Sequence, residues 1–259
     1  MLGKIFNMTQ RITLFTFFII CFFRGYTQKL SHEYQKVVQD FIQFVKTDNN
    51  FKIANLVTYP FEREYPIPEI KNKDEFVKRY SEIFEDSLKQ IIIKSDPVND
   101  WKEMGWRGLM LNQGDIWLDL DGRLISINYQ SKFEKSLRNK LIEEEKEKLY
   151  TSLKNYKKPI YILETSKYRI RIDYLGGLNY RYACWPIERE MSEKPDLVIE
   201  NGEFIPDGSG GNHSFKFKNG EYIYECYVTV IGENDSPPAL LTIYKNEKEI
   251  LEQKAKIRH

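Results

Sequence analysis

Charged side chains that could bind a ligand and exchange protons with it gather in one stretch of the sequence, next to two tryptophans. The charged residues are Arg107, Asp115, Asp119 and Asp121, and the tryptophans are Trp106 and Trp117. An arginine and carboxylates beside aromatic rings could bind a small ligand in a pocket and exchange protons with it. A lyase, isomerase or hydrolase built in this way would need further polar groups facing inward, and Tyr59, Tyr65 and Tyr80 are the candidates.

Strand periodicity decides which way these side chains face. Turn signals at residues 113–114 and 121–122 separate three runs of alternating apolar residues, and an Asp-Gly pair between such runs indicates a hairpin. We predict strands over residues 105–111, 116–120 and 123–129. The predicted pairs are Leu111 with Ile116, Leu109 with Leu118, Arg107 with Leu120, Leu118 with Ile125, and Ile116 with Ile127. The face predicted to meet the helices therefore holds Leu109, Leu111, Ile116, Leu118, Ile125 and Ile127.

The opposite face of this predicted sheet carries Trp106, Met110, Trp117, Asp119, Leu124 and Ser126. Asp119 thus points away from any pocket inside the domain, because strand residues alternate between faces. Arg107 is left at the rim of such a pocket. The register weakens the enzymatic interpretation, and we assign no catalytic residue. It predicts instead that the face with Trp106 and Trp117 docks on a second domain or on a partner.

A glycine-rich stretch at residues 207–213 is the second candidate site. Asp207, Asn212 and the loop carbonyls could hold calcium, and His213 could act as an acid–base or metal ligand. The stretch lacks the spacing of the helix-loop-helix calcium motif, and strands rather than a strand and a helix flank it. We predict a flexible loop between strands. The alternative is that the protein is an inhibitor or immunity protein and that this loop enters the cleft of a target protein. The sequence has no Cys-x-x-Cys, no His pair with metal spacing and no Gly-x-Ser-x-Gly, so neither a metal nor a cofactor is predicted.

The amino-terminal residues have the composition of a secretory signal peptide. Lys4 and Arg11 precede an apolar run over residues 12–23, which is shorter than the about 20 residues that a membrane span requires. We predict cleavage after Thr27 or Gln28 and a periplasmic or extracellular location. Cys21 lies inside the run rather than at its end, and bulky Ile20 precedes it, so lipid attachment is not expected.

Cleavage would leave two cysteines, Cys184 and Cys226. An even number of cysteines in an oxidising compartment permits a disulfide, and two buried free thiols are the equally supported alternative. The alternation of Tyr180, Tyr182 and Cys184 places these three side chains on one face of a strand, where they could pack beside the second cysteine.

Composition narrows the classes of partner. Lys and Arg number 39 against 38 for Asp and Glu, so no basic excess points to nucleic acid. Aromatic residues make up 14% of the chain, with 17 tyrosines, which suits strands and protein or carbohydrate surfaces equally.

Residues 29–130 are predicted to form an α+β domain. Ser31 begins an amphipathic helix, a short helix follows at residues 51–57, and the proline-rich segment 59–68 is extended. Asn72 begins a helix that continues to Ile91, before the three strands. The prediction is a set of helices packed on a curved antiparallel sheet.

This order of elements, together with the strand block GWRGLMLNQGDIWLDLDGRLISINY, resembles the nuclear-transport-factor-two-like, or SnoaL-like, cone fold. Within that family it looks most like exported proteins of Bacteroidetes-type bacteria. The likeness covers roughly residues 30–130. It implies a cone-like fold and little about function, because cone-fold members include isomerases, dehydratases, scaffold proteins and pure binding modules.

Two further segments complete the chain. Residues 131–158 are highly charged and are predicted to form a solvated connecting helix. Residues 159–259 alternate repeatedly and predict six or seven short strands in a sandwich or small barrel. The sequence as a whole predicts an exported, non-catalytic binding or envelope-associated module, with a protein or a small molecule as partner and without a membrane span in the mature chain.

Overall fold

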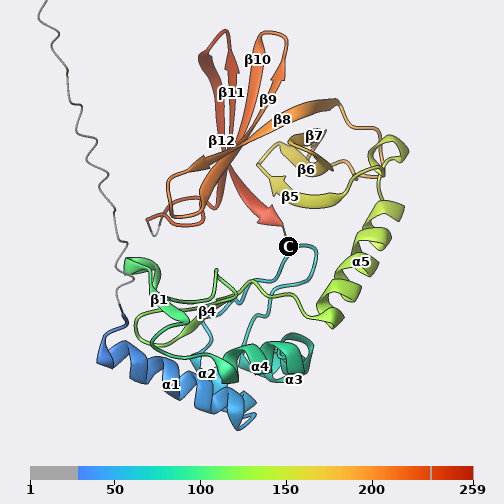
Figure 1. Ribbon diagram of the computed structural model, residues 1–259. Coiled ribbons are helices and arrows are strands. Elements are labelled where there is room, and N and C mark those ends of the chain that lie inside the picture. The colour runs from blue at the N-terminus through green and yellow to red at the C-terminus, as the bar shows by residue number, and fades with distance from the viewer. Residues whose placement is uncertain (1–28, 234, 259) are drawn as a thin grey trace, which may run out of the picture.

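The computed structural model describes residues 29–233 and 235–258. The predicted signal peptide, its cleavage site and Cys21 lie outside the described residues. The α+β class is confirmed: five helices and a four-stranded sheet precede a closed eight-stranded antiparallel barrel in the described chain. Figure 1 shows the first four helices and the small sheet in one lobe, the barrel in the other, and the fifth helix along one side of both.

Side chains at the helix starts set the boundaries in the first lobe. The helices are α1 (His32–Lys46), α2 (Asn50–Leu56), α3 (Lys73–Ile83) and α4 (Asp86–Lys94). Ser31 Oγ accepts a hydrogen bond from Tyr34 N, and Asn72 Oδ1 accepts one from Glu75 N, so both predicted caps are confirmed. The single helix predicted from Asn72 to Ile91 is wrong, because the chain leaves helical geometry between Phe84 and Glu85.

The small sheet follows the predicted register except at one bulge. Its strands are β1 (Trp101–Glu103), β2 (Leu109–Leu111), β3 (Ile116–Leu118) and β4 (Leu124–Ile127), in that order. The pairs that agree with prediction are Leu109 with Leu118, Leu111 with Ile116, and Ile116 with Ile127. Leu118 pairs with Leu124 instead of Ile125, because the register shifts between Trp117 and Leu118. Leu124 is consequently buried and Ile125 exposed, the reverse of the prediction.

The strand predicted over residues 105–111 is also interrupted. Residues Gly105–Arg107 form a short 3-10 helix, and only β2 remains extended. Arg107 therefore does not pair with Leu120. Aromatic and aliphatic side chains fill the space between the helices and the sheet, including Phe41, Phe61, Phe76, Phe84 and Trp101.

The second lobe is a barrel in which each strand pairs with the next along the chain. Its strands are β5 (Lys158–Glu164), β6 (Tyr168–Gly176), β7 (Asn179–Pro186), β8 (Leu197–Asp207), β9 (Asn212–Asn219), β10 (Tyr222–Val228), β11 (Ala239–Lys245) and β12 (Lys248–Arg258). Pairing of β12 with β5 closes the ring. Of the two predicted architectures, the small barrel is therefore the one observed, with a strand, β12, that the sequence did not indicate.

In two strands, β8 and β12, the first part pairs with one neighbouring strand and the second part with the other. The first part of β8 pairs with β7 and its second part, from Glu203, pairs with β9. Gly202 lies at this corner, where a Cβ would approach Phe217 Cε1 to 2.1 Å. The Asn201-Gly202 pair is thus a bend within a strand. On the opposite side, β12 pairs with β11 up to Ala255 and with β5 from Lys256 onward.

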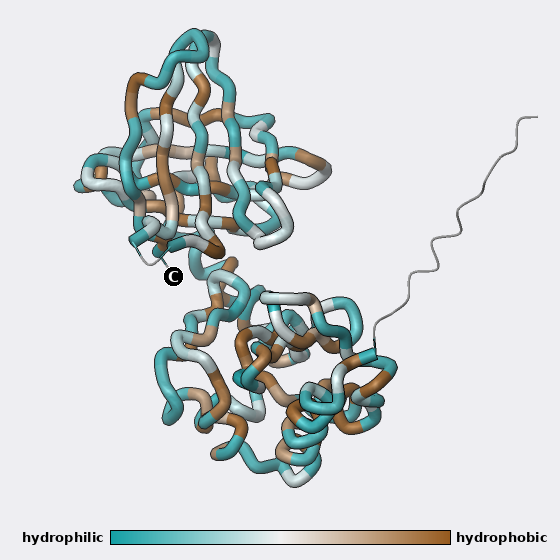
Figure 2. The backbone as a smooth tube through the Cα atoms, turned by 90° about the vertical axis from the view of Figure 1, so that its left-hand side faces the viewer, coloured by the Kyte–Doolittle hydropathy of each residue, from teal (hydrophilic) through white to brown (hydrophobic). Residues whose placement is uncertain are grey.

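Side chains fill the inside of the barrel. Buried interior residues include Leu163, Ile170, Ile172, Tyr182, Phe215, Phe217 and Leu241. Figure 2 shows hydrophobic positions interspersed with hydrophilic ones along the barrel strands, as expected for a sheet with one face inside. An eight-stranded barrel is just wide enough for side chains to fill it in this way.

Both cysteines lie in this interior as free thiols. Cys184 and Cys226 are buried and are not bonded to each other. Burial raises the pKa of Cys184 to about 11, and it raises the pKa of Cys226 further above its ordinary value. Of the two alternatives, the structure contains the buried free thiols and not the disulfide.

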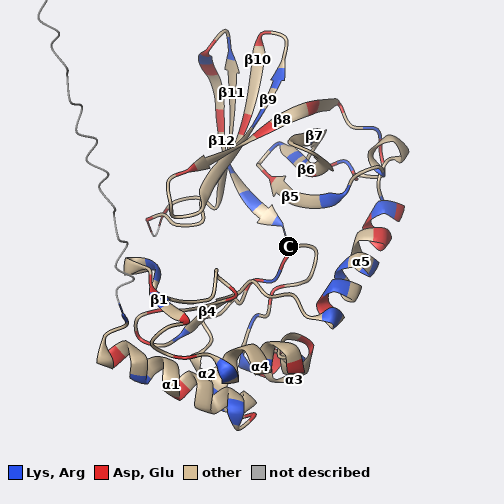
Figure 3. Cartoon of the chain, in the orientation of Figure 1, with Lys and Arg blue, Asp and Glu red and all other residues tan. Residues whose placement is uncertain are grey.

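The connecting helix α5 (Lys132–Glu147) was predicted to be solvated, but one of its sides is buried. It buries Glu134, Arg138 and Ile142. At its start Glu134 pairs with Arg63 of the first lobe, and near its end Glu145 pairs with Arg171 of the barrel. Figure 3 shows acidic and basic positions along this helix, and those on its inner side tie the two lobes together.

Candidate functional site

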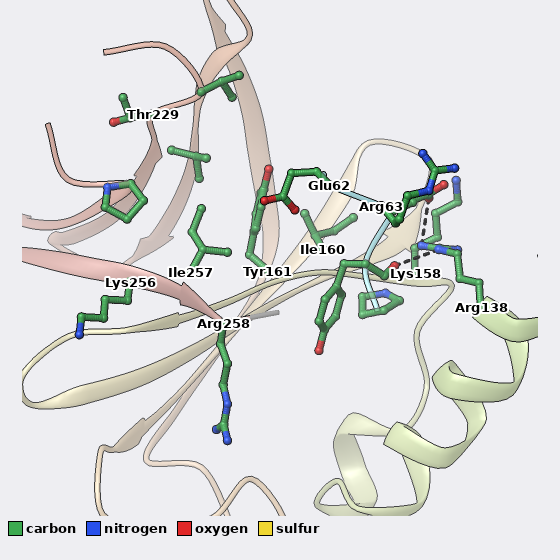
Figure 4. Close-up of a pocket in the computed structure, with 16 residues that line it drawn as sticks. Glu62, Arg63, Arg138, Lys158, Ile160, Tyr161, Thr229, Lys256, Ile257 and Arg258 are labelled. Atoms are coloured by element: carbon green, nitrogen blue, oxygen red, sulfur yellow. Dashed lines mark hydrogen bonds and ion pairs between the residues drawn. The ribbon is translucent and has the colours of Figure 1, made fainter. Parts of the chain in front are cut away.

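A cleft of about 770 Å³ lies at the rim of the barrel, where the first lobe crosses it. One side is residues 62–65, which we call the strap, together with Arg138 of α5. The other side comes from the start of β5 at residues 158–161, the end of β12 at 256–258, and residues 228–230 with Pro238. Figure 4 shows these segments around one open space.

Ion pairs and hydrogen bonds of two arginines hold the strap in place. Arg63 donates to both carboxylate oxygens of Glu134 at 2.6 Å and to Ile127 O at 2.6 Å. Arg138 donates to Tyr65 O at 2.9 Å and pairs with Glu64 at 3.0 Å. Because each arginine is fixed by more than one acceptor, the strap is a rigid wall rather than a free loop.

The inner wall of the cleft is apolar. Tyr161, Val228 and Ile257 come from three different strands, and Val228 is fully buried. The ring of Tyr161 stacks on His213 at 5.7 Å and lies edge-on to Phe215 at 6.1 Å, so packing fixes its orientation. Ile160, Val230 and Pro238 extend this apolar surface outward, as Figure 4 indicates for Ile160.

Positive charge predominates around the cleft. Its lining holds five cationic side chains and two carboxylates. Arg63 and Arg138 are neutralised by Glu134 and Glu64, and Arg258 pairs with Glu164 at 3.1 Å. Lys158 and Lys256 form no ion pair with any other described residue. They lie at opposite sides of the cleft in Figure 4, so an anion entering it meets uncompensated positive charge.

Tyr161 supplies a hydroxyl to the same space. Burial, and then the nearby Glu62 carboxylate, raises the pKa of the Tyr161 phenol. Figure 4 shows Glu62 beside the Tyr161 ring. The phenol therefore stays protonated at neutral pH and can donate a hydrogen bond.

Arg107 and Trp106, at one edge of the sheet face predicted to dock on a second domain or a partner, lie beside a loop of the barrel. Arg107 Nη1 donates to Ser209 O at 3.4 Å in the glycine-rich loop, and its guanidinium lies 5.7 Å from the ring centre of Trp117. A Cβ on Gly210 would lie 3.6 Å from Trp106 Cη2. The structure thus brings together two regions, residues 106–117 and 207–213, that the sequence singled out separately.

The polar residues of the glycine-rich loop have structural partners. Asn212 Oδ1 accepts hydrogen bonds from Val230 N at 2.8 Å and from Ile231 N at 2.9 Å. Asp207 accepts one from the hydroxyl of Tyr227 at 2.7 Å, and His213 Nδ1 lies 2.8 Å from Gly211 O. These contacts hold the loop against its neighbours, and none of the three side chains points to a shared ligand.

The groups proposed for an enzyme in the first lobe are not gathered in one place. Tyr59 donates to Ala54 O, Tyr65 donates to Glu145 of α5, and Tyr80 stacks on Phe84 at 4.7 Å. The carboxylates serve turns: Asp119 Oδ1 accepts from Asp121 N and Arg123 N, and Asp115 accepts from Asn112 Nδ2. Among the described residues, Phe and Leu side chains fill the space between the helices and the sheet of the first lobe.

Except for Tyr65, sequence reasoning did not single out the residues that line the cleft. Lys158, Tyr161, Lys256 and Ile257 come from strands β5 and β12, which meet only because the barrel closes. The one available signal was the run Lys254, Lys256 and Arg258 near the end of the chain, where alternate positions are basic.

Among the described residues, no group of three or more His, Cys, Asp and Glu side chains is arranged to hold a metal ion. In the same part of the chain, no helix has the length and apolar character needed to cross a membrane. The chain matches no model of a protein family, no curated protein and no solved structure.

Proposed function

We propose that this protein is a binding module whose rim cleft takes a small amphiphilic anion, such as a carboxylate with an aliphatic body. The observation that carries the proposal is an apolar cleft flanked by Lys158 and Lys256, two cations without an ion-pair partner among the described residues. The apolar wall suits the aliphatic body, and the lysines suit the charged group.

The size and position of the cleft support a ligand of this kind. Its volume of about 770 Å³ falls within the range of about 300–1,000 Å³ that is typical of small-molecule sites. The filled barrel interior keeps the ligand at the rim, in contact with both lobes. Because strap and barrel are each fixed by buried contacts, the site is formed before the ligand arrives.

Binding is favoured over catalysis at this cleft. Its lining, taken from the described residues, includes no Ser, Cys or His, so it offers neither a Ser–His nor a Cys–His pair. Tyr161 belongs to the wall of the cleft, and in this proposal its hydroxyl donates a hydrogen bond to an oxygen atom of the ligand's carboxylate.

The proposed setting is outside the cytoplasm. This part of the proposal rests on the signal-like composition of residues 1–28. We further propose that the first lobe is a variant of the cone-like fold in which a filled core has replaced the ligand cavity, and that its remaining contribution to binding is the strap.

Charge reversal at the cleft is expected to weaken anion binding about tenfold or more. The test is calorimetric titration of octanoate into the wild type and into a Lys158→Glu/Lys256→Glu variant. Two unit charges about 4 Å apart near a protein surface interact by several kcal/mol, and each 1.4 kcal/mol changes affinity tenfold. Both lysines are exposed, so the variant is expected to fold normally.

The matched control is Lys218→Glu/Lys254→Glu, which makes the same charge change at exposed strand positions outside the cleft. Octanoate affinity should stay within about twofold of the wild type in this control. Equal loss in both variants, or no saturable binding to the wild type, would contradict the proposal.

A further inference from the structure

Three large apolar side chains are exposed together beside the cleft. Trp106 is 64% exposed, Val230 is 58% exposed and Ile231 is 43% exposed. Val230 also lines the cleft, so this apolar surface continues the apolar wall of the site outward. A contiguous exposed patch of this kind marks a binding surface more often than single exposed apolar residues do.

Two glycines form the floor between these side chains. A Cβ on Gly210 would lie 3.4 Å from Ile231 Cδ1 and 3.6 Å from Trp106 Cη2, and a Cβ on Gly211 would lie 3.4 Å from Val230 Cγ1. The side chains of Val230, Ile231 and Trp106 therefore surround the two glycines. We call the apolar strip made by these five residues the trough; it starts at Val230, which lines the cleft, and ends at the indole of Trp106.

The walls of the trough are held in place. Asn212 fixes the backbone of Val230 and Ile231 through two hydrogen bonds to one side-chain oxygen. On the other side, Arg107 stacks on Trp117 and reaches Ser209 O, which ties the 3-10 helix containing Trp106 to the loop. The trough is therefore a preformed surface and does not depend on a loop closing over the ligand.

We infer that the ligand of the cleft is a long unbranched acyl carboxylate whose tail leaves the cleft past Val230 and lies in the trough as far as Trp106. This inference rests on the proposed function, since it assigns the head group to the cleft. The filled barrel gives a long tail no route inward, and the trough is an apolar surface continuous with the site. Lys158 and Lys256, which form no ion pair with another described residue, favour an acid over a neutral lipid.

Chain length provides the first test. Each methylene removed from water strengthens binding about fourfold. Hexadecanoate, kept below its micelle concentration, should therefore bind the wild type at least about tenfold more tightly than octanoate. The measurement is calorimetric titration of the full chain with each acid.

Two variants localise the tail. Gly210→Leu should fill the trough and Ile231→Ser should remove one wall, and each should weaken hexadecanoate binding about fivefold to tenfold while leaving octanoate within about twofold. Ile231 is exposed, so Ile231→Ser keeps the test valid if Gly210→Leu does not fold. The matched control is Ile250→Ser, an equal change at a residue that is 53% exposed on β12 and outside the cleft lining.

Fluorescence gives an independent readout. A hexadecanoic acid brominated near its methyl end should quench the emission of Trp106, and a Trp106→Phe variant should lose that quenching. This inference is wrong, while the proposed function stands, if octanoate binds, hexadecanoate binds no more tightly than octanoate, and the brominated acid does not quench Trp106. If neither acid binds, both are wrong.

Discussion

Replacing Asp173 by alanine should lower the free energy of unfolding by about 3–5 kcal/mol, the cost of breaking a buried ion pair. Asp173 is fully buried between two arginines. It lies 2.7 Å from Arg171 Nη2 and 2.7 Å from Arg181 Nη2. Without its carboxylate, two guanidinium groups would remain buried with one carboxylate, Glu145, among them.

The buried cluster is costly to break because its cations cannot give up their charge. Burial lowers the pKa of Arg171, but Asp173 and Glu145 outweigh burial and hold that pKa above its ordinary value. Arg181 also donates to Leu153 O at 2.6 Å, which fixes the segment after α5 on the barrel. Urea unfolding of the wild type and the variant measures the difference in the free energy of unfolding, provided that this free energy depends equally steeply on urea concentration in both proteins.

The control for this variant is Asp196→Ala. Asp196 pairs with Arg189 at 2.8 Å, but their side chains are 53% and 41% exposed. An exposed pair contributes about 0–1 kcal/mol, so this control should be nearly neutral. Similar losses for both variants would show that burial does not determine the strength of these pairs and would contradict our description of the cluster.

Replacing Gly108 by alanine should destabilise the first lobe by more than about 3 kcal/mol. Gly108 has φ 97° and ψ −152°, a region that is open almost only to glycine and costs other residues about 1–3 kcal/mol. A Cβ there would also lie 2.1 Å from Leu118 O, a backbone atom of β3 that cannot rotate away. Relief would require β3 to move, and with it the sheet that supports Trp106.

Gly105 is the control, since it lies at the other end of the same 3-10 helix. It has φ 61°, but a Cβ on it would meet nothing within 4 Å. Gly105→Ala should therefore cost only the left-handed backbone conformation, about 1–2 kcal/mol. The same unfolding measurement applies, and a Gly108→Ala variant no less stable than Gly105→Ala would contradict the predicted clash.

Asp173 and Gly108 lie outside the cleft, but each helps to hold one of its sides in place. The cluster around Asp173 holds α5 on the barrel, and α5 in turn holds the strap through Arg138 and Glu134. Gly108 allows the chain to turn into β2 and so places the 3-10 helix with Trp106 and Arg107 against the barrel loop. Both sides of the proposed site therefore depend on contacts between the lobes.

Local structure was predictable where one short stretch of sequence decides it. Ser31 and Asn72 cap helices as their side chains suggest, and the two turns at residues 113–114 and 121–122 place most of the first sheet in register. The bulge at Trp117 was not predictable, because a register shift of one residue depends on how Leu124 packs in the core rather than on the turn itself.

The site was not predictable, because it depends on closure of the barrel. Lys256 and Lys158 become neighbours of one cleft only when β12 pairs with β5, and Arg258 and Glu164 are 94 residues apart in the sequence. The charged sequence of β12 hid its strand character, since only one of its faces meets the core. The charges of α5 likewise suggested a solvated helix. Glu134 and Arg138 are nevertheless buried, because residues of the strap pair with them.

The most direct test of the central claim is to locate bound octanoate by NMR. Titration into isotopically labelled protein should produce saturable shifts of backbone amides at residues 158–161, 228–230 and 256–258, which line the cleft. Amides in the barrel interior strands away from the rim, and in α1, should be unaffected. Absence of saturable shifts, or saturable shifts confined to residues outside the cleft, would contradict the account.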